Sequence, residues 1–402
     1  MILIKNISQL LLMDKEDFTI IEDGYLIIKN GKIFDFGKMS NLKVKKKDYE
    51  IINADGCCLM PGFIDSHTHL FFSGERDEEL EMRLKGESYY EILKRGFGIY
   101  YTAQKTKEKN DEELEKENYQ KLLKVLTWGT TTIEIKSGYG IYPDEELRHL
   151  RIIKKLKEKL KEKITILPTF LIHIKPKDIE TKEYLSLMKK TMEIVKKEKL
   201  AIFCDVFCEK GESTFSYEES LELLSYGKRL GLIPKIHANE LAKSKGDYAA
   251  YKVGSISADH LIYPEKKYLK LMKEKDIVCT LLPGTSLFLK TKEKPPIEFM
   301  KRLGLKLAIA SDYNPGTCPI YQMPIIISLG CFLYGFNEKE ALYYSTMGNA
   351  YALNIQDKVG SIEKGKVADL IILKYERYQK LFYYFFKNPV KTIIKKGKII
   401  NL

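Results

Sequence analysis

The sequence predicts an α/β protein built on a TIM (β/α)8 barrel, with a small discontinuous β-sandwich domain formed by both ends of the chain. In the middle of the chain, short apolar runs alternate with helical patterns, whereas both ends carry β-rich runs and glycine turns. Almost all the histidines follow predicted strands. We expect residues 1–58 and 355–402 to form the composite β-sandwich, and residues 59–354 to form the barrel.

The barrel prediction depends on eight apolar runs, each followed by a helical pattern or a loop. Parallel strands joined by helices produce this alternation, and eight is the strand number of a closed (β/α)8 barrel. The expected strands are 59–65, 130–135, 164–170, 201–207, 234–237, 255–259, 277–282 and 305–310.

The two ends of the chain have a different pattern. Residues 25–36 place two β-rich runs on either side of Asn30 and Gly31, a pair typical of a tight hairpin turn. Residues 360–373 and 390–400 again alternate β-rich runs with glycine turns. We therefore expect the ends to pack together beside the barrel.

The composition indicates no specialised partner. The 402 residues carry 67 Lys and Arg against 55 Asp and Glu, a formal net charge of +12. The lysines concentrate in helical stretches such as 151–163, where they intermix with glutamates as on a solvated helix face. We therefore expect neither a nucleic-acid partner nor a membrane partner.

The cysteines and the N-terminus indicate a cytoplasmic protein. Seven cysteines without a CxxC pair are typical of reduced thiols, and Cys204 and Cys208 lie in an apolar run that predicts burial. The first residues lack the pattern of a signal peptide. Nor does any uncharged apolar run reach the roughly 18 residues that a membrane span needs.

The histidines are concentrated where a barrel carries its active site. Five of the six lie at or just beyond the ends of predicted strands: His67, His69, His173, His237 and His260. Active sites of (β/α)8 barrels form at these carboxyl ends. The sixth, His149, lies in the amphipathic run 144–163, and we expect it on the surface of a helix.

His67 and His69 form the most informative local motif. Residues two apart at a strand end point to the same side, so both imidazoles can bind one metal. Alone, such a pair could be accidental, and a single His or Asp is often a satisfied core residue or a helix cap. However, His237, His260 and Asp312 also end predicted strands, and this repeated placement favours a metal site.

This pattern resembles the amidohydrolase superfamily, which has HxH after the first barrel strand, a His after the fifth and sixth, and an Asp after the eighth. The resemblance implies that His67, His69, His237 and Asp312 bind the metal. No lysine is placed as a bridging ligand, so we expect one metal per chain. Zinc and iron both suit these ligands, and the sequence leaves that choice open.

Within the superfamily, nearly the whole chain resembles the imidazolonepropionases. The matching segments are 73–76, 89–92, 134–140, 168–171, 205–210, 257–261, 282–285 and 311–316. The resemblance implies that Glu240, His260 and Asp312 are catalytic. The implied substrate-binding residues are Arg76, Tyr89, Tyr139, His173, Asn314, Gly316 and Thr317.

The implied reaction is hydrolysis of the small molecule 4-imidazolone-5-propionate to N-formimidoyl-L-glutamate in histidine degradation, by a cytoplasmic homodimer. A metal-activated water would attack the ring lactam carbonyl. Asp312 could accept a proton, His260 could orient the nucleophile or stabilise the oxyanion, and Glu240 could protonate the departing nitrogen. Which of the three is the principal base stays open. Arg76 is the expected partner of the propionate, because a guanidinium matches a carboxylate.

Two alternatives remain. A guanine or cytosine deaminase would share the HxH motif, the His-x-x-Glu motif and the strand-eight Asp, but its substrate has no anionic arm for Arg76 to hold. A catalytically inactive barrel could serve as a binding protein, although the complete set of expected metal ligands argues against it.

Overall fold

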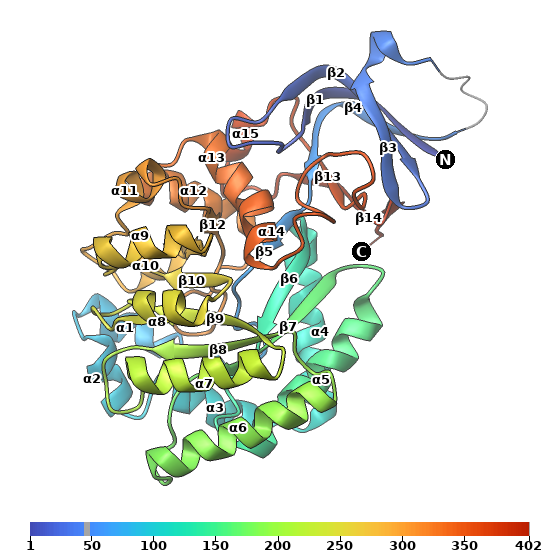
Figure 1. The fold of residues 1–402 in the computed structure, drawn as a ribbon. Coiled ribbons are helices and arrows are strands. Elements are labelled where there is room, and N and C mark those ends of the chain that lie inside the picture. Colours follow the sequence, from blue (N-terminus) through green and yellow to red (C-terminus); the bar gives the residue numbers. More distant parts are fainter. Residues whose placement is uncertain (44–48, 402) are drawn as a thin grey trace.

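The computed structural model describes residues 1–43 and 49–401, and its larger part is a barrel of parallel strands surrounded by helices (Figure 1). The expected class of fold is confirmed. The eight strands follow one another in chain order around the sheet, and each is parallel to the next. They are β5 (Phe63–Asp65), β6 (Thr130–Lys136), β7 (Thr165–Ile172), β8 (Phe203–Cys208), β9 (Ile233–Ala238), β10 (Ser257–His260), β11 (Val278–Leu281) and β12 (Leu307–Ile309).

The first and last barrel strands meet at their carboxyl ends. The backbone N–H of Asp312 donates to the carbonyl of His67 at 2.9 Å, and that of His69 donates to the carbonyl of Tyr313 at 2.9 Å. The Ser311 hydroxyl also donates to Asp65 at 2.5 Å. These bonds join the segments after β5 and β12, so residues at the two ends of the barrel sequence become neighbours.

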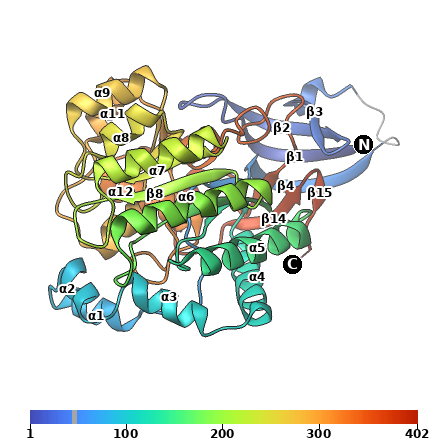
Figure 2. The same ribbon diagram turned by 60° about the horizontal axis from the view of Figure 1, so that its bottom comes forward.

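Helices cover the outside of the barrel and its carboxyl-end loops (Figure 2). Two of the long helices begin with a capping box, in which a polar side chain and a glutamate satisfy the first free N–H groups: Asn110 with Glu113, and Ser216 with Glu219. The helices are α1 (Glu78–Leu84), α2 (Tyr89–Lys94), α3 (Ile99–Lys107), α4 (Asp111–Thr127), α5 (Pro143–Leu160), α6 (Thr181–Lys197), α7 (Tyr217–Arg229), α8 (Gly246–Val253), α9 (Lys266–Glu274), α10 (Pro283–Phe288), α11 (Ile297–Arg302), α12 (Met323–Tyr334), α13 (Glu338–Tyr343), α14 (Asn349–Ala352) and α15 (Gln379–Tyr383).

Both ends of the chain contribute to a second sheet, in the order β15-β14-β13-β4-β1-β2-β3. The predicted hairpin at Asn30 and Gly31 is present and joins β2 to β3. The sheet curls, so that the β2–β3 and β14–β15 turns both contact Ala368. The Ala368 N–H donates to the Gly31 carbonyl at 2.9 Å, and the Gly397 N–H donates to the Ala368 carbonyl at 2.9 Å. Its strands are β1 (Ile2–Leu11), β2 (Ile20–Lys29), β3 (Lys32–Lys38), β4 (Glu50–Pro61), β13 (Leu370–Leu373), β14 (Val390–Lys395) and β15 (Lys398–Ile399).

The expected first barrel strand, 59–65, is divided between the two sheets. Residues up to Pro61 belong to β4 of the second sheet, and only Phe63–Asp65 pairs within the barrel. Gly62 separates them, and a Cβ there would lie 2.4 Å from the side chain of Thr131. An apolar run in the sequence predicts that its residues are buried, but it does not reveal which of two sheets they join. This division therefore could not be predicted. The domain limits 1–58, 59–354 and 355–402 stay a prediction.

His149 does not lie on the surface, and that expectation was wrong. It is 1% exposed on the inner face of α5, and its ring centroid lies 5.0 Å from that of Phe71. Ile152, Ile153 and Leu156 occupy the same helix face, at the spacing of a buried stripe. Burial lowers the pKa of His149 to about 3.

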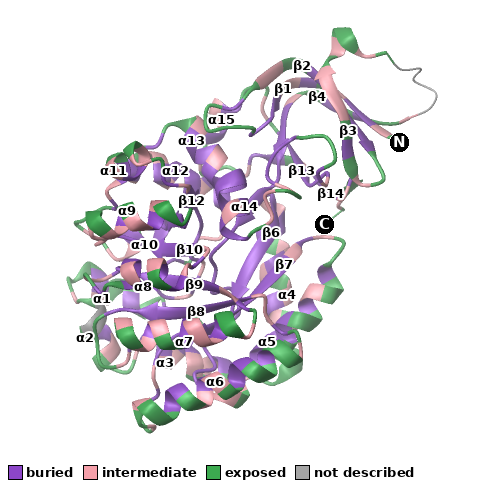
Figure 3. Ribbon diagram, in the orientation of Figure 1, coloured by how far each residue is buried: buried purple, intermediate pink, exposed green. Residues whose placement is uncertain are grey.

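Burial follows the layers of the fold, with the strands and inner helix faces enclosed and the outer faces exposed (Figure 3). Cys204 and Cys208 are fully buried, as expected. Within residues 1–43 and 49–401, none of the helices has the length and apolar character needed to cross a membrane.

A buried ion pair joins the second sheet to the amino-end side of the barrel. Lys395 on β14 is 1% exposed, and its Nζ lies 2.5 Å from Asp369 Oδ2. The ammonium also donates to the carbonyl of Thr131 on β6 at 2.8 Å and to the hydroxyl of Thr165 on β7 at 2.7 Å. Lys395 therefore fixes the C-terminal strands against two barrel strands.

We predict that Lys395→Met lowers the free energy of unfolding by about 3–5 kcal/mol, because Asp369 would then be a buried and unpaired charge. Denaturant unfolding measures this loss. The double variant Asp369→Asn, Lys395→Met should lose less than the single variant, since it leaves no unpaired charge. An unchanged free energy in Lys395→Met would contradict the account of this contact.

Candidate active site

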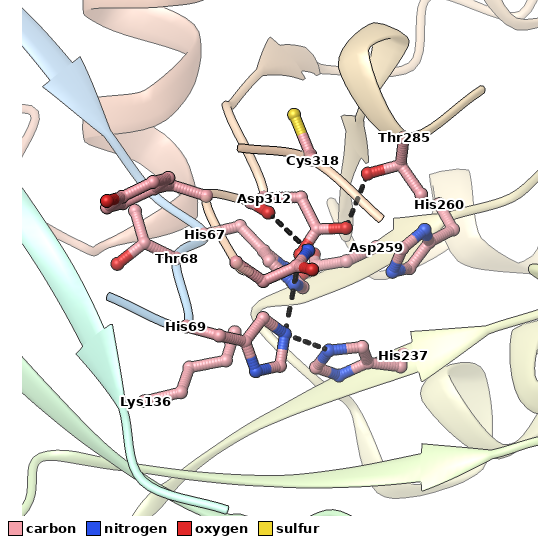
Figure 4. Close-up of polar contacts among 12 residues, drawn as sticks. His67, Thr68, His69, Lys136, His237, Asp259, His260, Thr285, Asp312 and Cys318 are labelled. Carbon is pink, nitrogen blue, oxygen red and sulfur yellow. Dashed lines mark hydrogen bonds and ion pairs between the residues drawn. The ribbon is translucent and has the colours of Figure 1, made fainter. Parts of the chain in front are cut away.

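Three histidines and an aspartate converge at the carboxyl end of the barrel (Figure 4). His67 and His69 follow β5, His237 lies in β9 and Asp312 follows β12. Nε2 of His69 lies 3.1 Å from Nε2 of His237 and 3.4 Å from Oδ1 of Asp312. Nε2 of His67 lies 3.6 Å from the same Asp312 oxygen. All four side chains are buried.

These residues fit a transition metal. Nε2 of His67 and Oδ1 of Asp312 are buried, and neither has a hydrogen-bond partner in the part of the chain that the structure describes. Such atoms are costly to bury, and a cation would satisfy them together. His67, His69 and His237 also lie close enough to bind one ion. The structure therefore places a candidate metal centre here, with imidazole and carboxylate ligands.

The ionisation states suit a metal. Burial lowers the pKa of His67 and His69 well below the usual value, so both rings are neutral, which is the form that binds metals. Burial raises the pKa of Asp312 to about 7. A cation beside this carboxylate would favour its ionised form.

Surrounding residues orient the candidate ligands. Nδ1 of His67 lies 2.6 Å from Oδ2 of Asp259, and Nδ1 of His237 lies 3.1 Å from Oδ2 of Asp205. The Thr285 hydroxyl donates to Oδ2 of Asp312 at 2.5 Å. These contacts lie at the ring nitrogen or carboxylate oxygen that faces away from the candidate metal centre. The other nitrogen of each imidazole and the other oxygen of Asp312 are thereby directed toward the centre.

Two of the site residues have an unusual backbone conformation. Asp312 has φ 55° and His260 has φ 75°, both in the left-handed region that residues other than glycine rarely adopt. The Asp312 backbone is held by its bond to His67, and its carbonyl accepts from the Asn314 side chain at 2.7 Å. Strain of this kind is typical of sites where side-chain direction matters more than local stability.

A narrow pocket opens beside the candidate metal ligands and brings together residues from loops far apart in the sequence. Of the predicted substrate-binding residues, Arg76, Tyr139, His173, Asn314 and Thr317 line it. The proposed catalytic residues Glu240, His260 and Asp312 line it too, together with His69 and His237. Ile99 and Phe207, which the sequence did not single out, add apolar walls. Tyr89 begins α2, but its side chain lies outside the described part of the structure.

Glu240 and His260 face each other in this pocket. Nε2 of His260 lies 3.5 Å from Oε2 of Glu240. Burial, with smaller contributions from Asp312 and Glu209, raises the pKa of Glu240 well above its usual value. Glu240 is thus suited to hold a proton next to the candidate metal ligands, whereas burial lowers the pKa of His260 and so favours its neutral form.

Arg76 belongs to a buried cluster with Glu79 and Arg83. Its Nε and Nη2 donate to the two Glu79 oxygens at 2.6 and 2.8 Å, and Nη2 of Arg83 donates to Glu79 at 2.6 Å. Glu79 thus holds two guanidinium groups, and Arg76 lines the pocket. Gly316 lies directly against Arg76, since a Cβ at this glycine would be 2.1 Å from the guanidinium carbon, and its carbonyl accepts from Arg83 at 2.5 Å.

Glu79 and Arg83 were not among the residues predicted for the site. Their spacing of four residues on α1 is a usable signal, because such residues lie on one helix face. Glu146 was not among them either, and its carboxylate accepts from the N–H groups of Gly138 at 2.9 Å and Ile141 at 2.8 Å. Glu146 thereby fixes the loop that carries Tyr139, whose ring lies 5.7 Å from that of His173.

Comparison with known proteins decides the family. The profile of the amidohydrolase family matches residues 58–400. The imidazolonepropionase of Caldanaerobacter subterraneus subsp. tengcongensis is 39% identical over 386 residues, which cover 95% of this chain and 91% of that protein. The chain belongs to the imidazolonepropionase family of the amidohydrolases. The imidazolonepropionase of Clostridium tetani is 35% identical and aligns over 99% of this chain and 98% of its own length.

Membership in this family makes the protein a metal-dependent hydrolase. Solved structures of other amidohydrolases share the fold. The 5-methylcytosine deaminase of Klebsiella pneumoniae, liganded with phosphonocytosine, superposes with a TM-score of 0.75, covering 100% of this chain and 98% of that chain. The guanine deaminase of E. coli gives a TM-score of 0.74 and covers 100% and 98%. At 17% and 16% identity, these likenesses concern the fold alone.

We predict that the protein, purified without added metal, contains about one transition-metal ion per chain and that His67→Ala loses it, because a ligand is removed from the centre. Elemental analysis of both proteins measures this. His149→Ala is the matched control, since it removes a buried histidine that faces Phe71 instead. Full metal occupancy in His67→Ala, or loss in the control, would contradict the assignment.

Proposed function

We propose that this protein is an imidazolonepropionase, which hydrolyses 4-imidazolone-5-propionate to N-formimidoyl-L-glutamate in histidine degradation. One observation carries the proposal: the candidate metal ligands His69, His237 and Asp312 line the same pocket as Arg76, whose guanidinium Glu79 holds in place. A small ring with a carboxylate arm matches this arrangement. The names of the relatives from Caldanaerobacter and Clostridium support the same substrate.

The proposed site uses one metal ion bound by His67, His69, His237 and Asp312. Zinc and iron both fit these ligands. When bound, the metal supplies Lewis acidity and makes a water molecule a stronger nucleophile near neutral pH.

The pocket residues account for the remaining chemistry. Water adds to the lactam carbonyl carbon, the ring carbon–nitrogen bond breaks, and the departing nitrogen takes a proton. Asp312 accepts the proton from the water, and Glu240 delivers one to the departing nitrogen. His260, 3.5 Å from Glu240, orients the water or stabilises the developing oxyanion.

Substrate binding is assigned to the other residues that line the pocket. Arg76 pairs with the propionate, and Gly316 keeps the space in which its guanidinium lies flat. Tyr139, His173, Asn314 and Thr317 surround the ring, and Tyr89 is retained as a proposed contact from α2. A homodimer in the cytoplasm, without nucleic-acid or membrane partners, completes the proposal.

The alternatives fit less well. A deaminase of guanine or cytosine binds a neutral base and would not need two arginines around one buried glutamate beside its pocket. A binding protein without activity would not need a proton-holding Glu240 next to the metal-binding residues.

The direct test is incubation of the purified protein with freshly generated 4-imidazolone-5-propionate, following the loss of the substrate's ultraviolet absorbance against its spontaneous decay. The proposal requires a protein-dependent loss with formation of N-formimidoylglutamate. No loss above the spontaneous rate with metal-replete protein would refute it.

We predict that Arg76→Met lowers kcat/KM for imidazolonepropionate by about 30-fold to 5,000-fold, which corresponds to about 2–5 kcal/mol, because the carboxylate would lose a charge-assisted pair in an enclosed pocket. Steady-state kinetics measure this loss. Arg76→Lys should recover only part of it, since an ammonium lacks the planar fork.

A substrate analogue without the carboxylate provides the control for Arg76. It should be a poor substrate for the wild type and nearly insensitive to the substitution, as expected when two partners form one interaction. Metal content should stay unchanged. Normal turnover of imidazolonepropionate by Arg76→Met would show that the carboxylate binds elsewhere.

We also predict that Glu240→Gln and His260→Ala retain metal but lose about 10²-fold or more in kcat, the range typical of a general acid–base group. Stopped or continuous rate assays with parallel elemental analysis separate the two effects. Wild-type rates in both variants, or loss of the metal, would contradict their assignment as groups that act on the substrate.

A further inference from the structure

Five charged side chains lie inside the barrel, beneath the candidate metal ligands, and none has a part in the reaction described above. They are Glu134, Lys136, Asp205, Lys235 and Asp259, and all are 0% exposed. Three carboxylates and two ammonium groups give this set a net charge of −1. Buried charges are costly unless they are closely paired, so their arrangement requires an explanation.

One half of the arrangement runs from His237 to Glu134. Nδ1 of His237 lies 3.1 Å from Oδ2 of Asp205. The same Asp205 oxygen accepts from Nζ of Lys136 at 2.8 Å, and this ammonium also donates to Oε1 of Glu134 at 2.9 Å. Burial alone would lower the pKa of Lys136, but Asp205 and Glu134 raise it above the usual value, so the side chain stays charged.

The other half runs from Glu134 to His67. Oε1 of Glu134 lies 3.6 Å from Nζ of Lys235, which lies 3.8 Å from Oδ2 of Asp259. Asp259 contacts Nδ1 of His67 at 2.6 Å. Lys235 also donates to the carbonyl of Ser66, next to His67, at 2.8 Å. A continuous series of alternating charges therefore connects two candidate metal ligands through the barrel interior.

The strand geometry explains why these residues meet. Glu134 and Lys136 are two apart on β6, and Lys235 and His237 are two apart on β9, so each pair points to the same side of its strand. Asp259 on β10 pairs in register with His237. Inward-facing residues of parallel strands stack in layers, and here one layer consists of charges instead of the usual branched apolar side chains.

A purely structural role explains this layer poorly. Apolar side chains of similar volume would fill the same space at equal or lower cost. The two ends of the series are carboxylates placed on the Nδ1 atoms of His67 and His237. A carboxylate at Nδ1 accepts the ring proton there, which leaves the lone pair of Nε2 directed toward the metal.

We propose that Lys136 is a positioning residue of the metal centre: it holds Asp205 against His237 and, through Glu134 and Lys235, belongs to the same charge network as Asp259 and His67. Without its ammonium, Asp205 would lose its closest cationic partner. The carboxylate would then no longer be fixed on Nδ1 of His237, and His237 would bind the metal less well.

Lys395 provides a matched control for Lys136. Both are buried lysines paired with an aspartate. Lys136 is part of β6, and Lys395 contacts β6 from the second sheet. Lys136 is the last residue of β6, beneath the metal ligands, whereas Lys395 contacts Thr131 near its start. Lys136→Met and Lys395→Met should therefore destabilise the protein to a similar extent but differ at the metal site.

The test measures the zinc affinity of each variant by competition with a chelator, alongside its unfolding in denaturant. We expect Lys136→Met to lose about 10-fold to 100-fold in zinc affinity, the range typical of removing an outer-sphere partner. Lys395→Met should keep the wild-type affinity. The proposal is overturned if Lys136→Met binds zinc as the wild type does, or if both variants lose affinity equally.

A second variant covers the case in which Lys136→Met does not fold. Glu134→Gln with Lys136→Met removes an opposite pair together, so the net charge of the layer is unchanged. It should still lose about 10-fold in zinc affinity, because Asp205 again lacks its ammonium. Its cobalt-substituted form should also show an altered visible spectrum, which a structural change far from the metal would not produce. A wild-type spectrum and affinity would overturn the proposal.

Discussion

The structure depends on one constraint: three imidazoles and a carboxylate must remain buried together with their lone pairs directed at a common point. Nε2 of His67 and Oδ1 of Asp312 have no hydrogen-bond partner among the described residues, and a cation bound between them would offset the free-energy cost of burying them. The contacts around them follow from this constraint. Asp259 contacts Nδ1 of His67, and Asp205 contacts Nδ1 of His237. The Thr285 hydroxyl contacts Oδ2 of Asp312.

The barrel meets the constraint by bringing its first and last strands together. The Asp312 N–H bonds to the His67 carbonyl, and this contact helps to hold Asp312 in a left-handed conformation directed at the histidines. Arg76, which also lines the pocket, has its own buried support, since Glu79 holds Arg76 and Arg83 in place. The candidate metal ligands and the proposed anion-binding Arg76 thus have separate sets of buried charged neighbours, and both line one pocket.

Much of this arrangement could be predicted from the sequence because it depends on strand ends. The apolar run before His67 and His69, and the runs before His237 and Asp312, identify residues that a parallel barrel must bring to one edge. Boundaries were less predictable, as Leu59–Pro61 shows, because burial alone does not reveal which sheet a strand joins. The expected surface position of His149 was wrong, because a single polar residue within an apolar helix stripe can be as buried as its apolar neighbours.

The supporting contacts could not be predicted, since they connect residues distant in the sequence. Asp259 and His67 are 192 positions apart, and Lys136 and Asp205 are 69 apart. No spacing rule relates such pairs; only the closed barrel places them side by side. The residues that carry the chemistry of a site can therefore be visible in short motifs, while the residues that orient them are not.

The most direct test of the proposed metal ligands and substrate position is a crystal structure of the metal-loaded protein with an unreactive analogue of imidazolonepropionate. The account predicts one metal bound by Nε2 of His67, His69 and His237 and by Asp312, with the analogue's ring beside Glu240 and its carboxylate on Arg76. A metal bound by other residues, or an analogue whose carboxylate lies away from Arg76, would contradict it.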